Sequence, residues 1–389
     1  MQSNSASGRA SVPVHGAPGR VSGRASVPPS PPVGPGPGRS YGGRAGGHPP
    51  GSRPALVARR RPRWRKVLLV SLLSLLLVAG LGTVALLFYS RGLDSNMDRI
   101  DAFGPLNPAE RPQKLAPGSL NILMLGSDSR DPEAPGGDRA DTIMLMHIPS
   151  AQDQAFLISI PRDLWVYVPP NVDGTAGGRE AKINAATAFG GVPLAVQTVE
   201  HYTGVHIDHV IKLDFGGFVE VTDALGGVEM DIEQTIQSIH RPRRTFEAGR
   251  QHLNGEEALD YVRQRYQFAD GDFTRMRNQQ QFLRALMDKA TSRETMTNPA
   301  RLHGFLQAMT STVTVDNELS LLNVAWKFRQ LRSDNLTFMT TPHAGTGMIG
   351  GESVVLSDDA AAAELFTSVR EDRITDWVQA NPDRAGGGD

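Results

Sequence analysis

The chain contains no cysteine among its 389 residues. This absence excludes a thiol nucleophile, a disulfide framework and a cysteine-based zinc site, so the fold must depend on its hydrophobic core. Two enzyme signatures are also missing, the Gly-x-x-x-x-Gly-Lys-Ser/Thr phosphate loop and the His-Glu-x-x-His zinc helix. The sequence therefore excludes the P-loop nucleoside triphosphatases and the zinc proteases that use these motifs.

Acidic residues are absent from positions 1–66, which hold twelve lysines and arginines. The net charge of the whole chain is −1, so the remaining residues carry 28 basic and 41 acidic side chains. A basic segment of this kind can bind nucleic acid. Here an uncharged run, Val67–Phe88, follows it directly and has close to the roughly 20 apolar residues needed to cross a bilayer. We therefore expect a membrane segment and no nucleic-acid partner.

The charges that flank Val67–Phe88 predict its orientation. Arg59–Lys66 is strongly basic, whereas Arg91 is the only basic residue close behind the run. The positive-inside rule then places the N-terminus in the cytoplasm and the C-terminal domain outside it, as a single-pass signal anchor of the cell membrane. A buried core helix is the alternative, but it would leave the basic cluster without a purpose.

Composition divides the chain into five parts. Residues 1–58 are rich in glycine, proline and arginine and are expected to form a disordered cytoplasmic tail, because they hold too few apolar side chains for a core. They are followed by the basic flank and transmembrane anchor (59–88), an extracytoplasmic tether (89–118), a globular domain (119–383) and a disordered tail (384–389).

Within the globular domain, nearly continuous apolar runs alternate with helical patterns. Asn121–Gly126, Thr142–Ile148 and Ala155–Ile160 suit strands buried on both faces. Apolar spacing predicts helices over 184–202, 215–225, 254–265, 273–290, 299–312, 319–331 and 364–379, and further strands over 209–213, 228–232 and 335–340. This mixture predicts an α/β fold, a three-layer α/β/α sandwich with a central mixed sheet, preceded by one transmembrane helix.

Arginines and aspartates are concentrated in two segments of this domain. The candidate site residues are Asp128, Arg130, Asp141 and Arg162 in the first segment and Arg263, Arg265, Asp272, Arg275 and Gln279 in the second. Arginine binds phosphoryl oxygens bidentately, and carboxylate oxygens bind Mg²⁺. Because Asp128 follows one predicted strand and Asp141 opens the next, the two carboxylates could converge on one ion. Local ion pairs, helix capping by Asp272 and dipole compensation by Arg263 and Arg265 are the alternatives.

Several motifs of this domain are similar, in order, to those of the LytR-CpsA-Psr family. They are Gly126–Arg130, Arg139–Met144, Ser159–Asp163, Lys182–Ala186, Leu225–Val228, Leu253–Leu259 and Arg263–Gln280, and the resemblance covers roughly residues 118–292. It implies a central sheet between helices, located outside the bacterial membrane. It also implies transfer of glycopolymers from polyprenyl-pyrophosphate carriers onto peptidoglycan.

The resemblance assigns a role to each candidate residue. Asp128 and Asp141 match the magnesium-associated acids, and Asp272 matches an acid proposed to assist the acceptor. Arg162, Arg263, Arg265, Arg275 and Gln279, to which we add Arg130, match the pyrophosphate-binding set, with Arg162 and Arg275 also acting in catalysis. The implied function is a Mg²⁺-assisted, membrane-anchored phosphotransferase of cell-wall assembly. A polyprenyl-pyrophosphate hydrolase and a non-catalytic polyprenyl-phosphate-binding regulatory protein are the alternatives.

One position departs from the family pattern. Where Arg-Gln-Gln is common, this chain has Asn278-Gln279-Gln280, with Arg277 one place earlier. A shift of one residue rotates a helical side chain by about 100°. We therefore do not expect Arg277 to replace the missing contact. The sequence gives no sign of which glycopolymer is carried.

Overall fold

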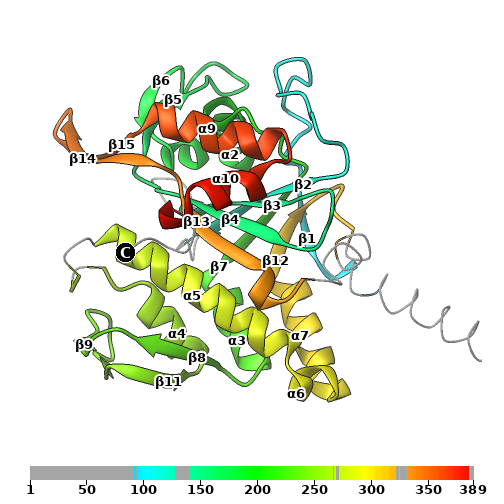
Figure 1. Cartoon of the computed structure of the whole chain (residues 1–389), viewed down its shortest axis with the longest axis vertical. Helices are drawn as coiled ribbons and strands as arrows, with labels where there is room; N and C mark the ends of the chain where they lie inside the picture. Colours follow the sequence, from blue (N-terminus) through cyan, green and yellow to red (C-terminus); the bar gives the residue numbers. More distant parts are fainter. Residues whose placement is uncertain are drawn as a thin grey trace, which may run out of the picture. The chain divides into compact units, whose positions relative to one another are not determined.

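The computed structural model describes Gly92 and residues 95–127, 140–265, 267–268, 271–320, 324 and 331–384, with only the backbone of Phe215 and Asp272. Within these residues, seven strands form one mixed sheet in the order β1-β12-β7-β2-β3-β4-β13 (Figure 1). They are β1 (Asp98–Ile100), β2 (Leu120–Ser127), β3 (Ala140–Ile148), β4 (Ala155–Ile160), β7 (His209–Asp214), β12 (Val313–Asp316) and β13 (Leu336–Thr340). The predicted mixed α/β fold with a central mixed sheet is confirmed.

Three adjacent strands of the sheet, β2, β3 and β4, are the apolar runs of the sequence. Every residue of β4 is buried, and β2 and β3 are buried along most of their length. Such strands have no polar side because helices cover both faces of the sheet. The two faces therefore carry separate parts of the core.

Strand direction brings four carboxyl ends to one edge of the sheet. β2 is parallel to β7 and antiparallel to β3, while β4 is antiparallel to β3 and parallel to β13. The strands β2, β4, β7 and β13 therefore all end at the edge where β3 begins. In α/β sheets, ligands usually bind beyond the carboxyl ends of the strands.

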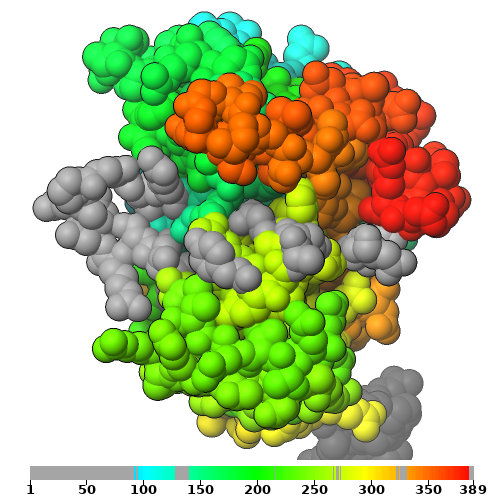
Figure 2. Space-filling model, turned by 90° about the vertical axis from the view of Figure 1, so that its left-hand side faces the viewer, coloured from blue at the N-terminus to red at the C-terminus, as the bar shows by residue number. Residues whose placement is uncertain are grey.

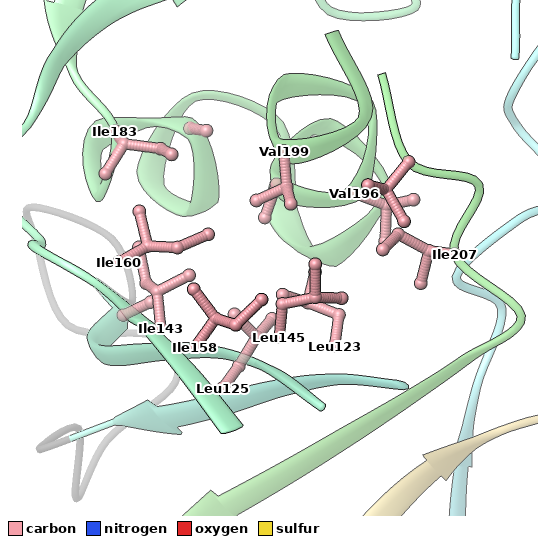
Figure 3. Close-up of a cluster of buried hydrophobic side chains, with 14 of the residues drawn as sticks. Leu123, Leu125, Ile143, Leu145, Ile158, Ile160, Ile183, Val196, Val199 and Ile207 are labelled. Carbon is pink, nitrogen blue, oxygen red and sulfur yellow. The ribbon is translucent and has the colours of Figure 1, made fainter. Parts of the chain in front are cut away.

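One face of the sheet is covered by α2 (Ala185–Thr203), α9 (Asp359–Arg370) and α10 (Ile374–Ala380). Figure 3 shows Val196 and Val199 of α2 directed at Leu123 and Leu145 on the strands. The apolar side of α2 belongs to this core. Val192 and Val196 are buried in the core, which supports ordinary packing.

The opposite face is covered by the long helix α5 (Asp272–Thr291), whose Leu283 and Met287 pack against strand residues such as Met144 (Figure 1). α5 also packs against a smaller layer that contains the pairs β8 (Val228–Ile232) with β11 (Gly249–Leu253) and β9 (Ile236–Gln237) with β10 (Thr245–Phe246), together with α3 (Phe215–Ala224) and α4 (Gly255–Val262). The Phe282 ring of α5 stacks on Phe218 of α3 at 4.1 Å. α5 therefore has core contacts on both sides.

The remaining described elements are two hairpins, two α-helices and two short 3-10 helices, Ser333–Asn335 and Pro382–Arg384. The hairpins are β5 (Trp165–Val168) with β6 (Arg179–Lys182) and β14 (His343–Ile349) with β15 (Glu352–Ser357); the α-helices are α6 (Arg293–Met296) and α7 (Pro299–Thr312). The single helix predicted over 364–379 is wrong, because Asp372 has a left-handed φ of 57° and separates α9 from α10. Most of the helix predicted over 319–331 lies outside the described residues.

The tether predicted over 89–118 is shorter than expected. Asp98–Ile100 pairs with β12 as an edge strand, and Ala102 and Leu106 are buried in the core. Arg111 then forms a bidentate ion pair with the buried Glu200 of α2. These contacts were missed because the segment has polar and proline-rich composition, and its few apolar residues are buried only by the assembled sheet.

The predicted transmembrane helix, Val67–Phe88, lies outside the described residues and stays a prediction. Among the residues that the structure does describe, no helix has the length and apolar character needed to cross a bilayer.

Candidate active site

The turn that follows β4 and the first residues of β3 meet at the end of the sheet where β2, β4, β7 and β13 terminate. We call this end of the sheet the ligand edge. Because Ile143 pairs with Ile160 across the antiparallel strands, Asp141 and Arg162 extend beyond the same pair. Arg162 Nη1 donates a hydrogen bond to Asp141 Oδ1, and the two side chains are 16% and 25% exposed. The structure thus brings this carboxylate and this guanidinium together at the end of the sheet.

Helix α5 contributes the second guanidinium. Arg275 is 6% exposed, and its Nη2 donates to the backbone oxygen of Asp141 at 3.3 Å. Two arginines from distant parts of the chain thus contact one aspartate, which fixes the spacing of their planar groups. Paired guanidiniums of this kind suit the oxygens of a phosphoryl group.

The first turn of α5 lies at this edge. Gly271 is the N-cap, with a φ of 48° that favours glycine, and among the residues that the structure describes no side chain caps this end of the helix. The sequence allowed Asp272 to be the cap; it is instead the first helical residue. The N-terminal end of a helix carries partial positive charge, which adds to the positive character produced by Arg275.

Arg263 and Arg265 lie just after α4, whose start is fixed by the N-cap Asn254 in a capping box with Glu257. α4 ends at Val262, so Arg263 is its C-cap residue, and both arginines are half-buried. The short segment that carries them is held by the residue between them.

That residue, Gln264, is fully buried and was missed as a functional position. Its Nε2 donates to Ser238 Oγ at 3.0 Å and to Asp260 Oδ1 at 2.7 Å, and its Oε1 accepts from Gln267 Nε2. These bonds anchor the backbone between Arg263 and Arg265. The signal in the sequence was a polar residue between two arginines immediately after an amphipathic helix.

Tyr261, one turn before this segment, is buried and stacks edge-to-face with Phe246 at 5.4 Å. Burial raises the pKa of its phenol to about 12, with the nearby Glu233 charge adding to the effect. The phenol is therefore neutral at all physiological pH values, and its hydrogen bond to the backbone of Glu233 helps to fix α4.

The residues of α5 beyond Arg275 separate into different roles. Gln280 is buried and donates to Ser159 Oγ at 2.9 Å and to Met339 O at 3.3 Å, which ties the helix to β4 and β13. Gln279, the predicted ligand, is half-buried. Arg277 donates through Nη2 to Thr274 Oγ1 at 2.8 Å, back along the helix.

Asn278, which stands where relatives often have arginine, is 4% exposed. Its Nδ2 has no hydrogen-bond partner among the described residues. Arg277 lies two residues and Asn278 three residues beyond Arg275, so the two side chains leave α5 in directions about 100° apart. The guanidinium of Arg277 thus does not occupy the position of the side chain at 278.

Lys182 is a further cation near the site, and it was also missed as a site residue. Lys182 Nζ lies 3.3 Å from Asp163 Oδ1 and 3.5 Å from Glu352 Oε2, and Arg162 Nε lies 3.7 Å from Asp163 Oδ2. Asp163 therefore lies between Arg162 and Lys182. The signal was present in Ile160–Asp163 and Lys182–Asn184, where charged residues lie at or just beyond the end of a strand.

The structure describes only part of the predicted metal site. Asp128 and Arg130 lie outside the described residues, and so does the side chain of Asp272. Within the described part of the chain, no group of three or more histidine, aspartate or glutamate side chains could hold an ion. Asp141 contributes one carboxylate, and one of its oxygens already contacts Arg162. A single carboxylate fits a Mg²⁺ ion that takes its other ligands from water and phosphate.

A sequence profile of the LytR_cpsA_psr family matches residues 94–371. The chain belongs to this family. It is 31% identical to the cell wall biosynthesis protein LcpA of Corynebacterium glutamicum, over 76% of this chain and 63% of LcpA. It is 35% identical to the probable cell wall biosynthesis protein LcpB of the same organism, over 75% of this chain and 70% of LcpB.

A third relative has a more specific name. The chain is 32% identical to the polyisoprenyl-teichoic acid–peptidoglycan teichoic acid transferase TagV of Bacillus subtilis, over 59% of this chain and 58% of TagV. The chain thus spans less than two thirds of the length of LcpA and of TagV.

Solved structures of this family have the same fold. The crystal structure of B. subtilis TagV matches with a TM-score of 0.56 and 27% identity, over 66% of this chain and 97% of that chain. TagT bound to LIIa-WTA matches with a TM-score of 0.53 and 24% identity, over 70% of this chain and 99% of that chain. The second likeness concerns the fold alone.

Proposed function

We propose that this protein is a phosphotransferase that moves a glycopolymer from a polyprenyl-pyrophosphate carrier onto peptidoglycan. The observation that carries the proposal is the convergence of Arg162 and Arg275 on Asp141 at the ligand edge of the sheet. Family membership supports it, since TagV carries the name of a transferase of this type. Arg263, Arg265, Gln279 and Arg130 complete the proposed pyrophosphate-binding set.

In the proposed reaction, a sugar hydroxyl of peptidoglycan attacks the phosphorus next to the polymer. A new P–O bond forms to the acceptor, the bond to the bridging oxygen breaks, and polyprenyl phosphate leaves. The hydroxyl proton passes to a base, for which Asp272 is the proposed residue. The guanidiniums of Arg162 and Arg275 stabilise the charge on the phosphoryl oxygens, which is the main contribution of protein groups to such transfers.

A magnesium ion is part of the proposal. Asp141, together with Asp128, would hold it, and it would supply further positive charge to the phosphoryl oxygens when bound. The ion pair between Arg162 and Asp141 keeps the carboxylate at the edge where those oxygens would lie.

The location of the protein is also proposed. The basic cluster Arg59–Lys66 and the apolar run Val67–Phe88 support a single-pass protein of the cell membrane, with the N-terminus in the cytoplasm. This arrangement would place the folded domain on the side where peptidoglycan is found, next to a lipid-linked substrate.

The test uses full-length protein in detergent with a polyprenyl-pyrophosphate saccharide that is labelled in its sugar. With peptidoglycan present, we expect label in the peptidoglycan and release of polyprenyl phosphate, and roughly 10-fold to 150-fold slower transfer by Arg162→Lys. Equal release of polyprenyl phosphate without peptidoglycan would instead identify a hydrolase. Tight binding without any release would favour a non-catalytic regulatory protein.

A further inference from the structure

The hairpin β14–β15 places a histidine beside the first turn of α5. His343 is the first residue of β14 and follows β13 by two residues, so it lies at the edge where β13 and β4 end. Its ring stacks on Phe273, with centroids 4.3 Å apart and planes 18° apart. Phe273 is the second residue of α5 and lies two residues before Arg275. Figure 2 shows the orange hairpin directly above the yellow-green residues of this part of α5.

The base of the hairpin is attached to the same residues that support Arg162. Val355 N donates to Asp163 O at 2.8 Å, and Leu164 forms a β-bridge with Val355. Glu352 lies 3.5 Å from Lys182, which also contacts Asp163. The hairpin and α5 thus bring His343 to the same end of the sheet as Arg162 and Arg275.

The hydrogen bonds of His343 define which nitrogen carries the proton. The backbone N–H of Gly345 donates a hydrogen bond to His343 Nδ1 at 3.2 Å. Gly345 has a φ of 98°, a backbone conformation that favours glycine. An Nδ1 atom that accepts a bond has no proton, so the neutral ring carries its proton on Nε2. Burial lowers the pKa of this imidazole, which favours the neutral ring. Within the part of the chain that the structure describes, no hydrogen bond of Nε2 is present.

We propose that His343 is a positioning residue for the substrate, and that its Nε2–H donates a hydrogen bond to an oxygen of the sugar next to the pyrophosphate. This inference rests on the proposed function. The guanidiniums of Arg162 and Arg275 suit phosphoryl oxygens, whereas a neutral donor suits a hydroxyl or ring oxygen. A neutral ring also adds no positive charge to an end of the sheet that already carries Arg162 and Arg275. The stack on Phe273 holds the ring in one orientation.

Two variants separate the hydrogen bond from the stack. His343→Phe keeps a flat ring that can stack on Phe273 but has no N–H, while His343→Gln keeps an N–H near the position of Nε2 but has no ring. His343→Ala lacks both. Thermal unfolding of each full-length variant measures whether the fold is retained.

The measured quantity is the dissociation constant of the full-length protein for two probes, polyprenyl pyrophosphate and the same lipid carrying one sugar. We expect His343→Phe to weaken binding of the sugar-bearing lipid about fivefold to tenfold, the size of one neutral hydrogen bond. His343→Gln should restore most of this loss. Binding of polyprenyl pyrophosphate should be the same for the wild type and both variants.

Two results would overturn the inference. Binding of the sugar-bearing lipid that is kept by His343→Phe and lost by His343→Gln would show that only the stack matters. An equal loss for both probes would show that His343 acts on the pyrophosphate or on the fold. A wild-type protein that shows the expected sugar-dependent binding but transfers no glycopolymer would refute the proposed transferase, and the role of His343 would stand.

Discussion

Replacing Arg162 with lysine tests the central contact of the site. Lysine keeps the positive charge but loses the planar group that can bind two oxygens at once. In the structure, Arg162 already uses Nη1 for Asp141, and its Nε faces Asp163 at 3.7 Å. Lysine carries a single nitrogen in place of the guanidinium fork. It cannot contact Asp141 and a phosphoryl oxygen with the geometry that the guanidinium has. We therefore expect Arg162→Lys to lose one charged hydrogen bond to the substrate.

The size of the loss follows from the kind of bond. A hydrogen bond to a charged group contributes about 1.5–3 kcal/mol. Since about 1.4 kcal/mol corresponds to a factor of ten, kcat/KM should fall roughly 10-fold to 150-fold. Stability should change little, because the Arg162–Asp141 pair is partly exposed and such pairs contribute about 0.2–1 kcal/mol. The effect on turnover should thus exceed the effect on folding.

The assay measures transfer of labelled glycopolymer to peptidoglycan. Thermal unfolding of the same samples measures their stability. Arg277→Lys is the matched control, because it makes the same chemical change on α5 but its guanidinium bonds Thr274. We expect Arg277→Lys to keep wild-type turnover. Equal turnover by the wild type and Arg162→Lys would refute the assignment of Arg162 to the phosphoryl group. An equal loss for both variants would show that the orientation of α5 differs from the one described.

Three further predictions address the membrane, the metal and the support of α4. A reporter fused after Asp389 should be active only in a form that works outside the cytoplasm, and cytoplasmic activity would contradict the predicted orientation. Asp128→Asn should weaken the dependence of turnover on Mg²⁺ in a titration while thermal stability is kept; an early melting with unchanged turnover would make Asp128 structural. Because the Tyr261 pKa is raised from 10.0 to about 12, its contribution to stability is full below pH 10 and is lost as pH rises through 12. Tyr261→Phe should therefore flatten the alkaline fall in unfolding free energy, by up to roughly 2–3 kcal/mol, and an unchanged pH profile in chemical denaturation would contradict this.

Buried strands were the most predictable part of the fold. The runs that became β2, β3 and β4 are apolar at nearly every position, and only strands covered on both faces require that pattern. The short hairpins could not be found in this way. β14 alternates half-buried and exposed residues and contains two glycines, so its strand conformation depends on pairing with β15 rather than on local preference. β1 likewise exists only because β12 offers a partner edge.

The candidate site was predictable as a set of residue types but not as a set of contacts. Asp141 opens one predicted strand and Arg162 follows another, but the sequence did not pair the two residues. Their contact depends on the antiparallel register of β3 and β4, which no short segment specifies. Arg275 reaches Asp141 from a helix 134 positions away, and that approach is set by packing of α5 on the sheet. The supporting Gln264 was missed because a buried amide has the same appearance in sequence as an exposed one.

The packing around Asn278 explains how this chain can depart from the family pattern at that position. An arginine at this position would require a site for its charge, whereas the side chain at 278 is 4% exposed and lies on a helix with core contacts on both sides. A buried guanidinium is stable only with paired acceptors, and the cost of leaving it unpaired is several kcal/mol. The shorter, neutral amide removes that requirement and leaves Arg162 and Arg275 as the guanidiniums in contact with Asp141. The departure at 278 is therefore compatible with an intact Arg162–Asp141–Arg275 arrangement, because neither of its two contacts is made by the side chain at 278.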